Sequence, residues 1–417
     1  VRISILSLFL IGFGVKAAFF PIHSWLPDAH PEAPSPISAL LSGIMIKVGL
    51  FWIIRIFWEL FSVSPSWGSA LAVIGAFTII IGGFLAIVQN DIKRLIAYSS
   101  ISQVGYIMMG IGIGTGLGVA GGIIHLLNHA LFKGLLFFGA GIVVYVTGTR
   151  KLDDLGGLGK KMPVVFGSVV IGALSLAGVP PLNGFYSKWV LYQASIDFER
   201  GFAPFLLVAA LFGSTLSVIY IAKFIYSAFL GEMKTEVDRL PGRGMKVAVG
   251  APAILCLGLG VHPRPLLDSI RPVVGRIPVF EGTWVAYMAA AFLLGAIIVG
   301  VTLYALVDLK ERSKRKPAFM GGENEETIDT EMYFPYVKKL DFKVYPSEVY
   351  DSIKESKLVN WLFEAEERNF IDPYIAISWV AGALTRSFRW AHNGLLSRYL
   401  VWVFSGLIVI LWLLTTQ

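Results

Sequence analysis

The chain has 417 residues, of which 55% are hydrophobic and 15% charged, and its formal net charge is +7. Soluble globular proteins usually contain about 45–50% apolar and about 25% charged residues. The composition therefore excludes an ordinary soluble enzyme, a disordered chain and a nucleic-acid-binding domain. It indicates an all-α polytopic membrane protein, which we expect to lie in the cell (cytoplasmic) membrane.

Apolar runs recur along the chain, and most approach or exceed the roughly 20 residues that a membrane-spanning helix needs. Lys and Arg accumulate in cytoplasmic loops, so the side with more of them is expected to face the cytoplasm. Fifteen lie in loops on one side and four in loops on the other. The expected segments are 3–20, 36–57, 69–89, 95–113, 118–147, 163–196, 203–230, 245–262, 283–308 and 398–415. The basic loops are 90–94, 149–162, 231–246 and 309–316, opposed by 197–202 and 263–282.

Proline interrupts the predicted helices at two places. The stretch 21–36 contains five prolines and is not expected to form regular helix, because proline lacks an amide donor and clashes with a preceding carbonyl. Gly178–Gly184 interrupts 163–196 in the same way. Irregular backbone at membrane depth is tolerated only inside protein or beside a wet cavity. Two broken helices in corresponding halves of a chain therefore point to an ion site.

Two lysines lie inside predicted spans, and neither is expected near the end of its segment. Lys16 precedes the first interruption, and Lys47 lies in the following span. An ammonium group near the bilayer centre costs at least about 2.5 kcal/mol, so such a group usually faces the bundle interior and has a function. The alternative is a structural lysine that extends to the membrane surface.

His125, His129 and Lys133 follow one another at intervals of four residues, which places them on one face of a helix. Histidine titrates near neutral pH and can donate or accept a proton, so this polar stripe indicates a proton relay. A metal site is the alternative, but this helix offers no carboxylate and Lys133 would repel a cation.

Other polar residues carry weaker signals. Lys188 follows the second interruption and is a further candidate, whereas Lys223 is expected to extend toward the cytoplasmic surface. The four titratable residues of the first interruption could form a metal loop, but their spacing favours a structural role in which the histidines hydrogen-bond the irregular backbone. These four are His23, Asp28, His30 and Glu32. Cys256 is the single cysteine, so the chain cannot supply the four thiolates of an iron–sulfur cluster.

The C-terminal part differs from the rest. Within 309–397 acidic residues are frequent, and charged and apolar residues mix at helical spacing from 346 to about 393. This pattern predicts an amphipathic helix along a surface, followed by a terminal span. The predicted parts are 1–68, 69–230, 231–308 (additional spans), 309–397 (loop and lateral helix) and 398–417 (terminal span).

Three stretches, Val15–His30, Asn90–Gln103 and His125–Lys133, resemble the antiporter-like subunits of respiratory complex I, the Mrp-type Na⁺/H⁺ antiporters and the energy-converting membrane-bound hydrogenases. The resemblance covers roughly residues 1–308. It implies a fold of two inverted five-helix repeats, each with one broken helix. Residues 1–68 would then be the remainder of the first repeat and 69–230 the second five-helix repeat. The region 309–417 is similar to the end of the largest such subunit, a long lateral helix and a returning span, and its tail favours the hydrogenase type.

The resemblance also implies roles for the titratable residues. Lys16 occupies the position of the central proton-handling lysine, and Lys47 that of the relay lysine on the next helix. His125, His129 and Lys133 match the second half-channel, and Lys188 matches its terminal group. The family pairs the first lysine with a glutamate two helices earlier, which this sequence does not contain. We expect that glutamate either on residues absent from this sequence or on a partner chain.

Three functions follow as hypotheses. The leading one is an ion-translocating subunit of a redox-driven membrane oxidoreductase complex, with no cofactor or metal of its own and iron–sulfur clusters in partner subunits. A secondary Na⁺/H⁺ antiporter subunit without redox partners is the second, and a structural brace with an inactive channel is the third. The residues do not distinguish H⁺ from Na⁺, and they do not identify the electron donor or acceptor.

Overall fold

A computed structural model describes residues 2–274, apart from 62–63, 199–200, 236 and 238, and also Trp361 and 364–365. The chain divides into two units, Val1–Phe363 and Glu364–Gln417, and every helix described below belongs to the first. The predicted span 283–308, the lateral helix within 309–397 and the terminal span 398–417 lie outside the described residues.

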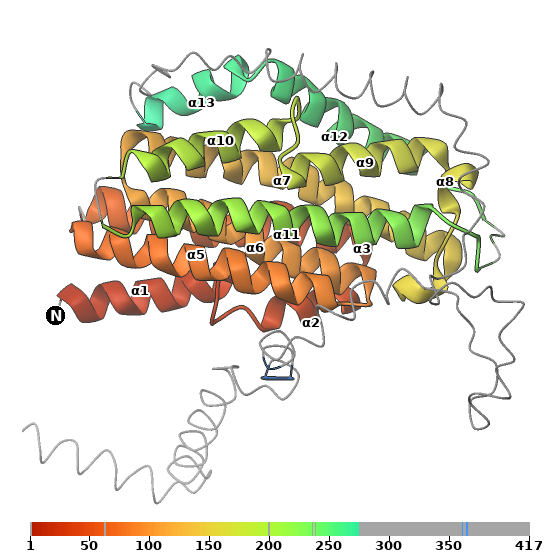
Figure 1. Cartoon of the computed structure of the whole chain (residues 1–417), viewed down its shortest axis with the longest axis horizontal. Helices are drawn as coiled ribbons and strands as arrows, with labels where there is room; N and C mark the ends of the chain where they lie inside the picture. The colour runs from red at the N-terminus through yellow and green to blue at the C-terminus, as the bar shows by residue number, and fades with distance from the viewer. Residues whose placement is uncertain are drawn as a thin grey trace, which may run out of the picture. The chain divides into compact units, whose positions relative to one another are not determined.

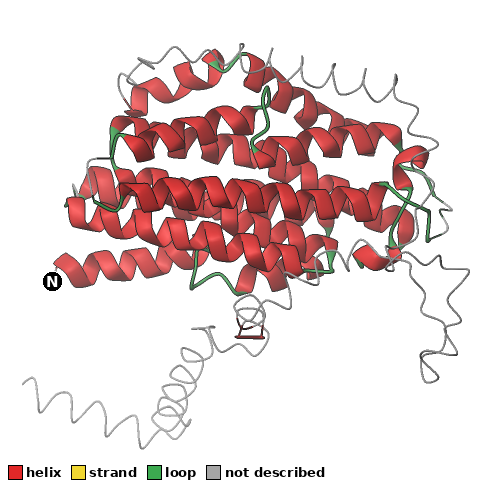
Figure 2. Cartoon of the chain, viewed as in Figure 1, coloured by secondary structure: helices red, strands yellow, loops and turns green. Residues whose placement is uncertain are grey.

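The described part of the first unit is helical, and no strand occurs in it (Figures 1 and 2). The helices before residue 150 are α1 (Arg2–Ala17), α2 (Trp25–Glu32), α3 (Ser35–Leu40), α4 (Ile46–Ile54), α5 (Pro65–Val88), α6 (Ile92–Ile113) and α7 (Gly116–Thr147). The later ones are α8 (Leu158–Lys161), α9 (Pro163–Ala177), α10 (Asn183–Ile196), α11 (Ala203–Phe229), α12 (Arg243–Val261) and α13 (Arg264–Val274). Two π-helical turns, Leu41–Met45 and Arg55–Leu60, and a 3₁₀ turn, Leu152–Asp154, complete the set.

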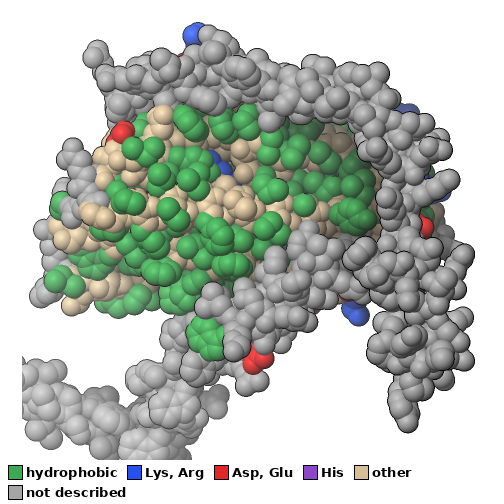
Figure 3. Space-filling model, in the orientation of Figure 1, with side chains coloured by type: hydrophobic (Ala, Val, Ile, Leu, Met, Phe, Trp, Pro, Cys, Tyr) green, Lys and Arg blue, Asp and Glu red, His purple; other side chains and the backbone are tan. Residues whose placement is uncertain are grey.

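Six of these stretches are long and apolar enough to cross a membrane. They are Ser35–Trp58 (α3, α4 and the π turns), Pro65–Val88, Ile92–Ile113, Gly116–Thr147, Ala203–Phe229 and Arg243–Val261. Figure 3 shows that hydrophobic side chains cover most of the face formed by α5 and α11. Large exposed apolar residues there include Phe77, Val208 and Leu211, as expected for a surface that contacts lipid. The predicted all-α polytopic membrane fold is therefore confirmed, whereas the inverted repeats stay a prediction.

Helix α6 forms the centre of the bundle, and its residues from Leu95 to Ile113 are all buried. It packs against α5, α7, α2, α10 and α11. Its first turn is capped by Asp91, whose carboxylate accepts hydrogen bonds from the amides of Lys93 (2.8 Å) and Arg94 (3.1 Å). The polar residues of α6 can therefore contact several neighbouring helices at once.

Small residues bring α5 and α6 into backbone contact. Gly68, Gly75 and Gly82 recur every seven residues on α5 and face α6. A Cβ atom on Gly75 would lie 2.5 Å from the amide nitrogen of Met109 and 2.7 Å from the carbonyl oxygen of Gly105. Close approach of this kind is typical of helix pairs in membranes, where packing replaces the hydrophobic effect.

Both predicted interruptions break a helix, but the first is shorter than expected. The irregular backbone comprises residues 18–24 between α1 and α2, and 178–182 between α9 and α10. The prediction that all of 21–36 is irregular was wrong, because α2 tolerates Pro27 in its first turn and Pro31 near its end. In the first turn a missing amide donor costs little, whereas at Pro31 one intrahelical hydrogen bond is lost. The indole of Trp25 then donates to the carbonyl of Val15 (2.7 Å), which ties the two halves together.

Candidate functional site: a buried line of lysine and histidine

Helix α7 supplies the first three candidates. His125, His129 and Lys133 are each fully buried (0% exposed), so the polar stripe predicted from their spacing faces the interior of the bundle. The rings of His125 and His129 lie 6.4 Å apart, centroid to centroid. Burying three titratable groups is costly unless other polar groups solvate them, so their neighbours decide what the stripe can do.

Lys133 is solvated by α6. Its ammonium nitrogen donates to the carbonyl oxygen of Ile96 (3.0 Å) and to the hydroxyl of Ser99 (2.5 Å). The Ile96 carbonyl also accepts from Ser100 (3.0 Å). One carbonyl on the central helix therefore joins Lys133 to a serine that points toward a different helix.

Lys47 is connected to the same serine, Ser100, through Ser42. Its ammonium nitrogen donates to the carbonyl of Ser42, within the π turn that precedes α4, and the Ser42 hydroxyl lies 2.9 Å from that of Ser100. π-helical turns are frequent at functional sites because they change the register of side chains and carbonyls. A series of polar contacts thus connects Lys47 with Lys133: each lysine donates to a backbone carbonyl, of Ser42 and of Ile96 respectively, and Ser100 contacts both the Ser42 hydroxyl and the Ile96 carbonyl.

His125 and His129 differ in their surroundings. The Nδ1 atom of His125 lies 2.8 Å from the hydroxyl of Ser187, and its Nε2 atom lies 3.1 Å from the side-chain oxygen of Gln103. Both ring nitrogens of His129 are buried without a hydrogen-bond partner among the described residues. Leaving both nitrogens unsatisfied is costly, and buried polar atoms of this kind normally bond to water.

Lys188 lies in α10, just after the second break. Its ammonium nitrogen donates to the carbonyl of Ala177 (3.2 Å), the last residue of α9, and lies 4.7 Å from the centroid of the Tyr106 ring. The carbonyl end of a helix carries partial negative charge and the face of an aromatic ring attracts cations. Gly178 leaves room for the lysine, because a Cβ there would lie 2.9 Å from its Cδ.

Two asparagines hold the second break against α7. The Asn128 amide donates to the carbonyl of Asn183 (2.9 Å), and the Asn183 amide donates to the Asn128 side-chain oxygen (3.0 Å). The hydroxyl of Ser175 donates to the side-chain oxygen of Asn183 and accepts from the amide of Gly184 (3.3 Å). The break is therefore fixed on both sides by fully buried amide and hydroxyl groups.

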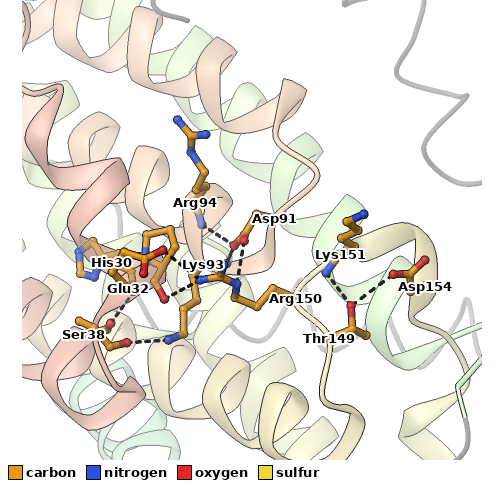
Figure 4. A network of polar contacts seen from close by, with 12 residues as sticks. His30, Glu32, Ser38, Asp91, Lys93, Arg94, Thr149, Arg150, Lys151 and Asp154 are labelled. Carbon is orange, nitrogen blue, oxygen red and sulfur yellow. Dashed lines mark hydrogen bonds and ion pairs between the residues drawn. The ribbon is translucent and has the colours of Figure 1, made fainter.

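One end of the bundle carries a partly exposed polar network, shown in Figure 4. Arg150 donates to the carbonyl of Pro31 (2.6 Å) and its Nε lies 3.3 Å from a carboxylate oxygen of Asp91. Lys93 donates to the carbonyl of Ala33 (2.7 Å). The loops before α6 and after α7 are thereby joined to the end of α2.

Lys16 does not join the buried line. It is exposed and lies in the last turn of α1, so the expectation that it is far from a helix end was wrong. Lys223, which was expected to extend to the surface, is buried and donates to the carbonyl of Ile87 near the end of α5 (2.8 Å). Sequence spacing places a residue on a helix, but the packing of other helices decides whether that face is covered.

The titratable residues of the first break do not form a metal site. Within the described residues no group of three His, Cys, Asp or Glu side chains converges. Asp28 and Glu32 point outward and pair with Arg94 (3.4 Å) and Arg150 (3.9 Å). The expectation that the histidines hydrogen-bond the irregular backbone was wrong for His30, whose two ring nitrogens are buried without a partner in the described part of the chain.

The sequence analysis missed the neutral residues that connect the candidates. All are hydroxyl or amide side chains in otherwise apolar helices, and most fall within 95–113, where Ser99, Ser100 and Gln103 interrupt a span. Such an interruption is the signal that could have identified them. The connecting residues are Ser42, Ser99, Ser100, Gln103 and Ser187.

The described residues therefore form a buried line in the order Lys47, Lys133, His129, His125 and Lys188. No buried Asp or Glu accompanies it among the residues that the structure describes. Its members on α7 are close enough to interact, because the rings of His125 and His129 lie 6.4 Å apart and Lys133 follows His129 by about one helical turn in a buried interior. Adding a proton at one position thus disfavours a proton at the next, which is the property that a proton-transfer line needs.

Comparison with known proteins places the chain among membrane subunits. A family model described as "NADH:quinone oxidoreductase/Mrp antiporter, TM" matches residues 2–217. Formate hydrogenlyase subunit 3 of Escherichia coli is 38% identical over 286 residues, which cover 64% of this chain and 47% of that protein. The chain spans about half the length of the curated relatives it matches.

Solved structures give the same grouping. A chain of the membrane-bound sulfane sulfur reductase, an archaeal respiratory membrane complex, is similar with a TM-score of 0.76 and 31% identity, covering 98% of this chain and 68% of that one. A chain of the Mrp complex from Dietzia sp. is similar with a TM-score of 0.61 and 25% identity, covering 69% and 61% respectively.

Proposed function

Because the chain belongs to the NADH:quinone oxidoreductase/Mrp antiporter membrane family, we propose that it is an ion-translocating subunit of a redox-driven membrane complex. It moves protons along the buried line from Lys47 to Lys188. The redox chemistry belongs to partner subunits that carry iron–sulfur clusters, while this chain holds no redox centre. The complex lies in the cell membrane, with the loops before α6 and after α7 on the cytoplasmic side.

The observation that carries the proposal is the shared hydrogen-bonded path between two buried lysines. Lys47 and Lys133 come from different helices. Lys133 donates to the Ile96 carbonyl on α6, and Lys47 donates to the carbonyl of Ser42, whose hydroxyl contacts Ser100 on α6. Two amines that only snorkelled would extend toward the membrane surface. These are instead buried. The hydroxyls of Ser42 and Ser100 can donate and accept in turn, whereas the carbonyls of Ser42 and Ile96 only accept, so in this proposal water carries the proton past those two points.

Electron transfer in a partner would drive transport by moving charge near one end of the line. A change at one end shifts the proton at the next group, because each charge acts on its neighbours through a medium of low dielectric constant. Lys188 at the other end lies beside a broken helix, where irregular backbone suits a hydrated outlet. Lys16 lies in the last turn of α1 with an exposed side chain, apart from the contacts described here, and its proton-handling role stays a prediction.

The test uses everted membrane vesicles that contain the whole complex. Proton uptake is followed with a pH-sensitive dye, and electron transfer is followed in parallel with an artificial electron acceptor. We expect Lys47→Met and His129→Ala to abolish proton uptake while electron transfer continues. Lys160→Met serves as a matched control, because this lysine is exposed on α8. An unchanged ratio of protons to electrons in both variants would reject the relay.

A second candidate is a subunit of a secondary Na⁺/H⁺ antiporter. The similarity to a chain of an Mrp complex favours it. Purification distinguishes the two functions, because iron–sulfur subunits co-elute with the chain only in the redox complex. In the antiporter, Na⁺ added to everted vesicles releases accumulated protons without any electron donor.

A further inference from the structure

His30 is a buried titratable group that the line above does not use. Its side chain is 0% exposed, and neither ring nitrogen has a hydrogen-bond partner among the described residues. Imidazole has one donor and one acceptor in its neutral form, and leaving both unsatisfied is costly. A ring buried in this way normally bonds to water, so His30 occupies a position that water can reach.

The ring of His30 packs against α7 about one helical turn beyond Lys133, where the stripe formed by His125, His129 and Lys133 would continue. Its ring stacks on Phe137, with centroids 4.2 Å apart and planes at 19°. Phe137 follows Lys133 by four residues, as Lys133 follows His129, and each such step advances about 6 Å along the helix. Helix α2 therefore supplies an imidazole where α7 itself carries phenylalanine.

This position lies on the cytoplasmic side of Lys133. Helix α7 runs from Lys133 toward Thr147 and the loop that carries Arg150. Arg150 donates to the carbonyl of Pro31, the residue that follows His30, and Glu32 beyond it is exposed. In Figure 4 the main chain of His30 faces this polar network and its ring points away from it. His30 thus stands between solvent and the line.

Electrostatics set the resting state of His30. Burial, and then the charges of Lys133, Lys93 and Lys47, lower the pKa of the ring to about 3, so the ring is neutral at rest and holds an extra proton only in passing. Lys93 belongs to the surface network and the other two belong to the buried line. The ring is therefore within reach of both groups of charges.

We propose that His30 is the residue through which protons pass between the cytoplasmic surface and Lys133. In the step we infer, the neutral ring takes up a proton from water at its bare nitrogen. It then releases the proton of its other nitrogen toward Lys133 through water, and rotation of the ring restores the starting tautomer. No electron or other group moves. The inference rests on the proposed function, because it requires that Lys133 carries protons.

The experiment measures proton uptake by everted vesicles that contain the complex, whose cytoplasmic face is then outside. His30→Asn keeps a polar side chain and His30→Phe keeps the stack on Phe137, but neither residue can relay a proton. We expect uptake to fall at least tenfold in both, since a positioned proton-transfer group contributes about 10²–10⁴-fold. Ser38→Ala is the matched control, because it removes only the hydrogen bond to the His30 carbonyl (3.0 Å).

Chemical rescue separates a relay from a structural role. We expect imidazole added to the outside to restore part of the uptake in His30→Ala but not in Lys133→Met, whose position is deeper. Normal proton uptake in both His30→Asn and His30→Phe overturns the inference. If only one of these variants assembles into the complex, its proton uptake alone decides. If Lys133→Met also takes up protons normally, the proposed function itself fails. If Lys133→Met loses proton uptake while the His30 variants keep it, only the role of His30 is rejected.

Discussion

Lys188 and Tyr106 form a cation–π pair next to a broken helix, with the ammonium nitrogen 4.7 Å from the ring centroid. The same amine donates to the carbonyl that ends α9, so Lys188 is held by an aromatic face and a helix terminus rather than by a carboxylate. Neither partner can take the proton from it. This arrangement stabilises the charge without trapping the proton, which suits the last group of a transfer line.

Replacing the ring should therefore reduce transport more than removing its hydroxyl. Tyr106→Leu removes a contact worth up to about 2 kcal/mol when desolvated, so we expect proton uptake to fall by about tenfold or more. Tyr106→Phe keeps the ring and should transport at a nearly normal rate. It loses the hydroxyl bonds to Ala210 (2.5 Å) and Ser214 (2.9 Å), which costs about 1 kcal/mol of stability. Equal uptake in the two variants would contradict the role of the ring.

Ser100 should matter for transport because it joins the two buried lysines. Ser100→Ala removes the hydroxyl between Ser42 and the Ile96 carbonyl. A single hydrogen bond is worth about 0.5–1.5 kcal/mol, so we expect proton uptake to fall by about three- to tenfold. Ser195→Ala is the control, because this buried serine bonds only to the carbonyl one turn before it in the contacts described. A similar loss in both variants would show that Ser100 acts through stability alone.

The backbone contact between α5 and α6 should be sensitive to added volume. In Gly75→Ala the new methyl group would press against the backbone of α6, so the helices must separate. We expect a loss of about 1–3 kcal/mol, seen as a lower unfolding temperature of the purified complex. Gly167→Ala is the matched control, since nothing lies within 4 Å of a Cβ at that helical position. It should leave the unfolding temperature unchanged or raise it slightly.

Asp91 has two roles that substitution can separate. Asp91→Ala removes both the cap of α6 and the ion pair with Arg150, and we expect it to cost about 1–2 kcal/mol of stability. Asp91→Asn keeps a capping oxygen and loses only the partly exposed ion pair, which is worth at most about 1 kcal/mol. Thermal unfolding of the purified complex gives the order. Equal unfolding temperatures for the two variants would mean that the cap contributes nothing.

The sequence by itself determined that this is a helical membrane protein, which two of its helices are broken, and which residues share a face within one helix. Composition and helical periodicity fix these features because they depend only on neighbours along the chain. His125, His129 and Lys133 were identified in this way.

Only the tertiary structure decided which residues meet. Lys47 reaches Lys133 through Ser42 and Ser100, and His30 lies on Phe137, although these residues are far apart in sequence. Lys16, which has the same chemistry as Lys47, stays exposed. The physical reason is that a membrane helix is apolar on nearly every face, so its sequence does not specify the partner against which each face packs.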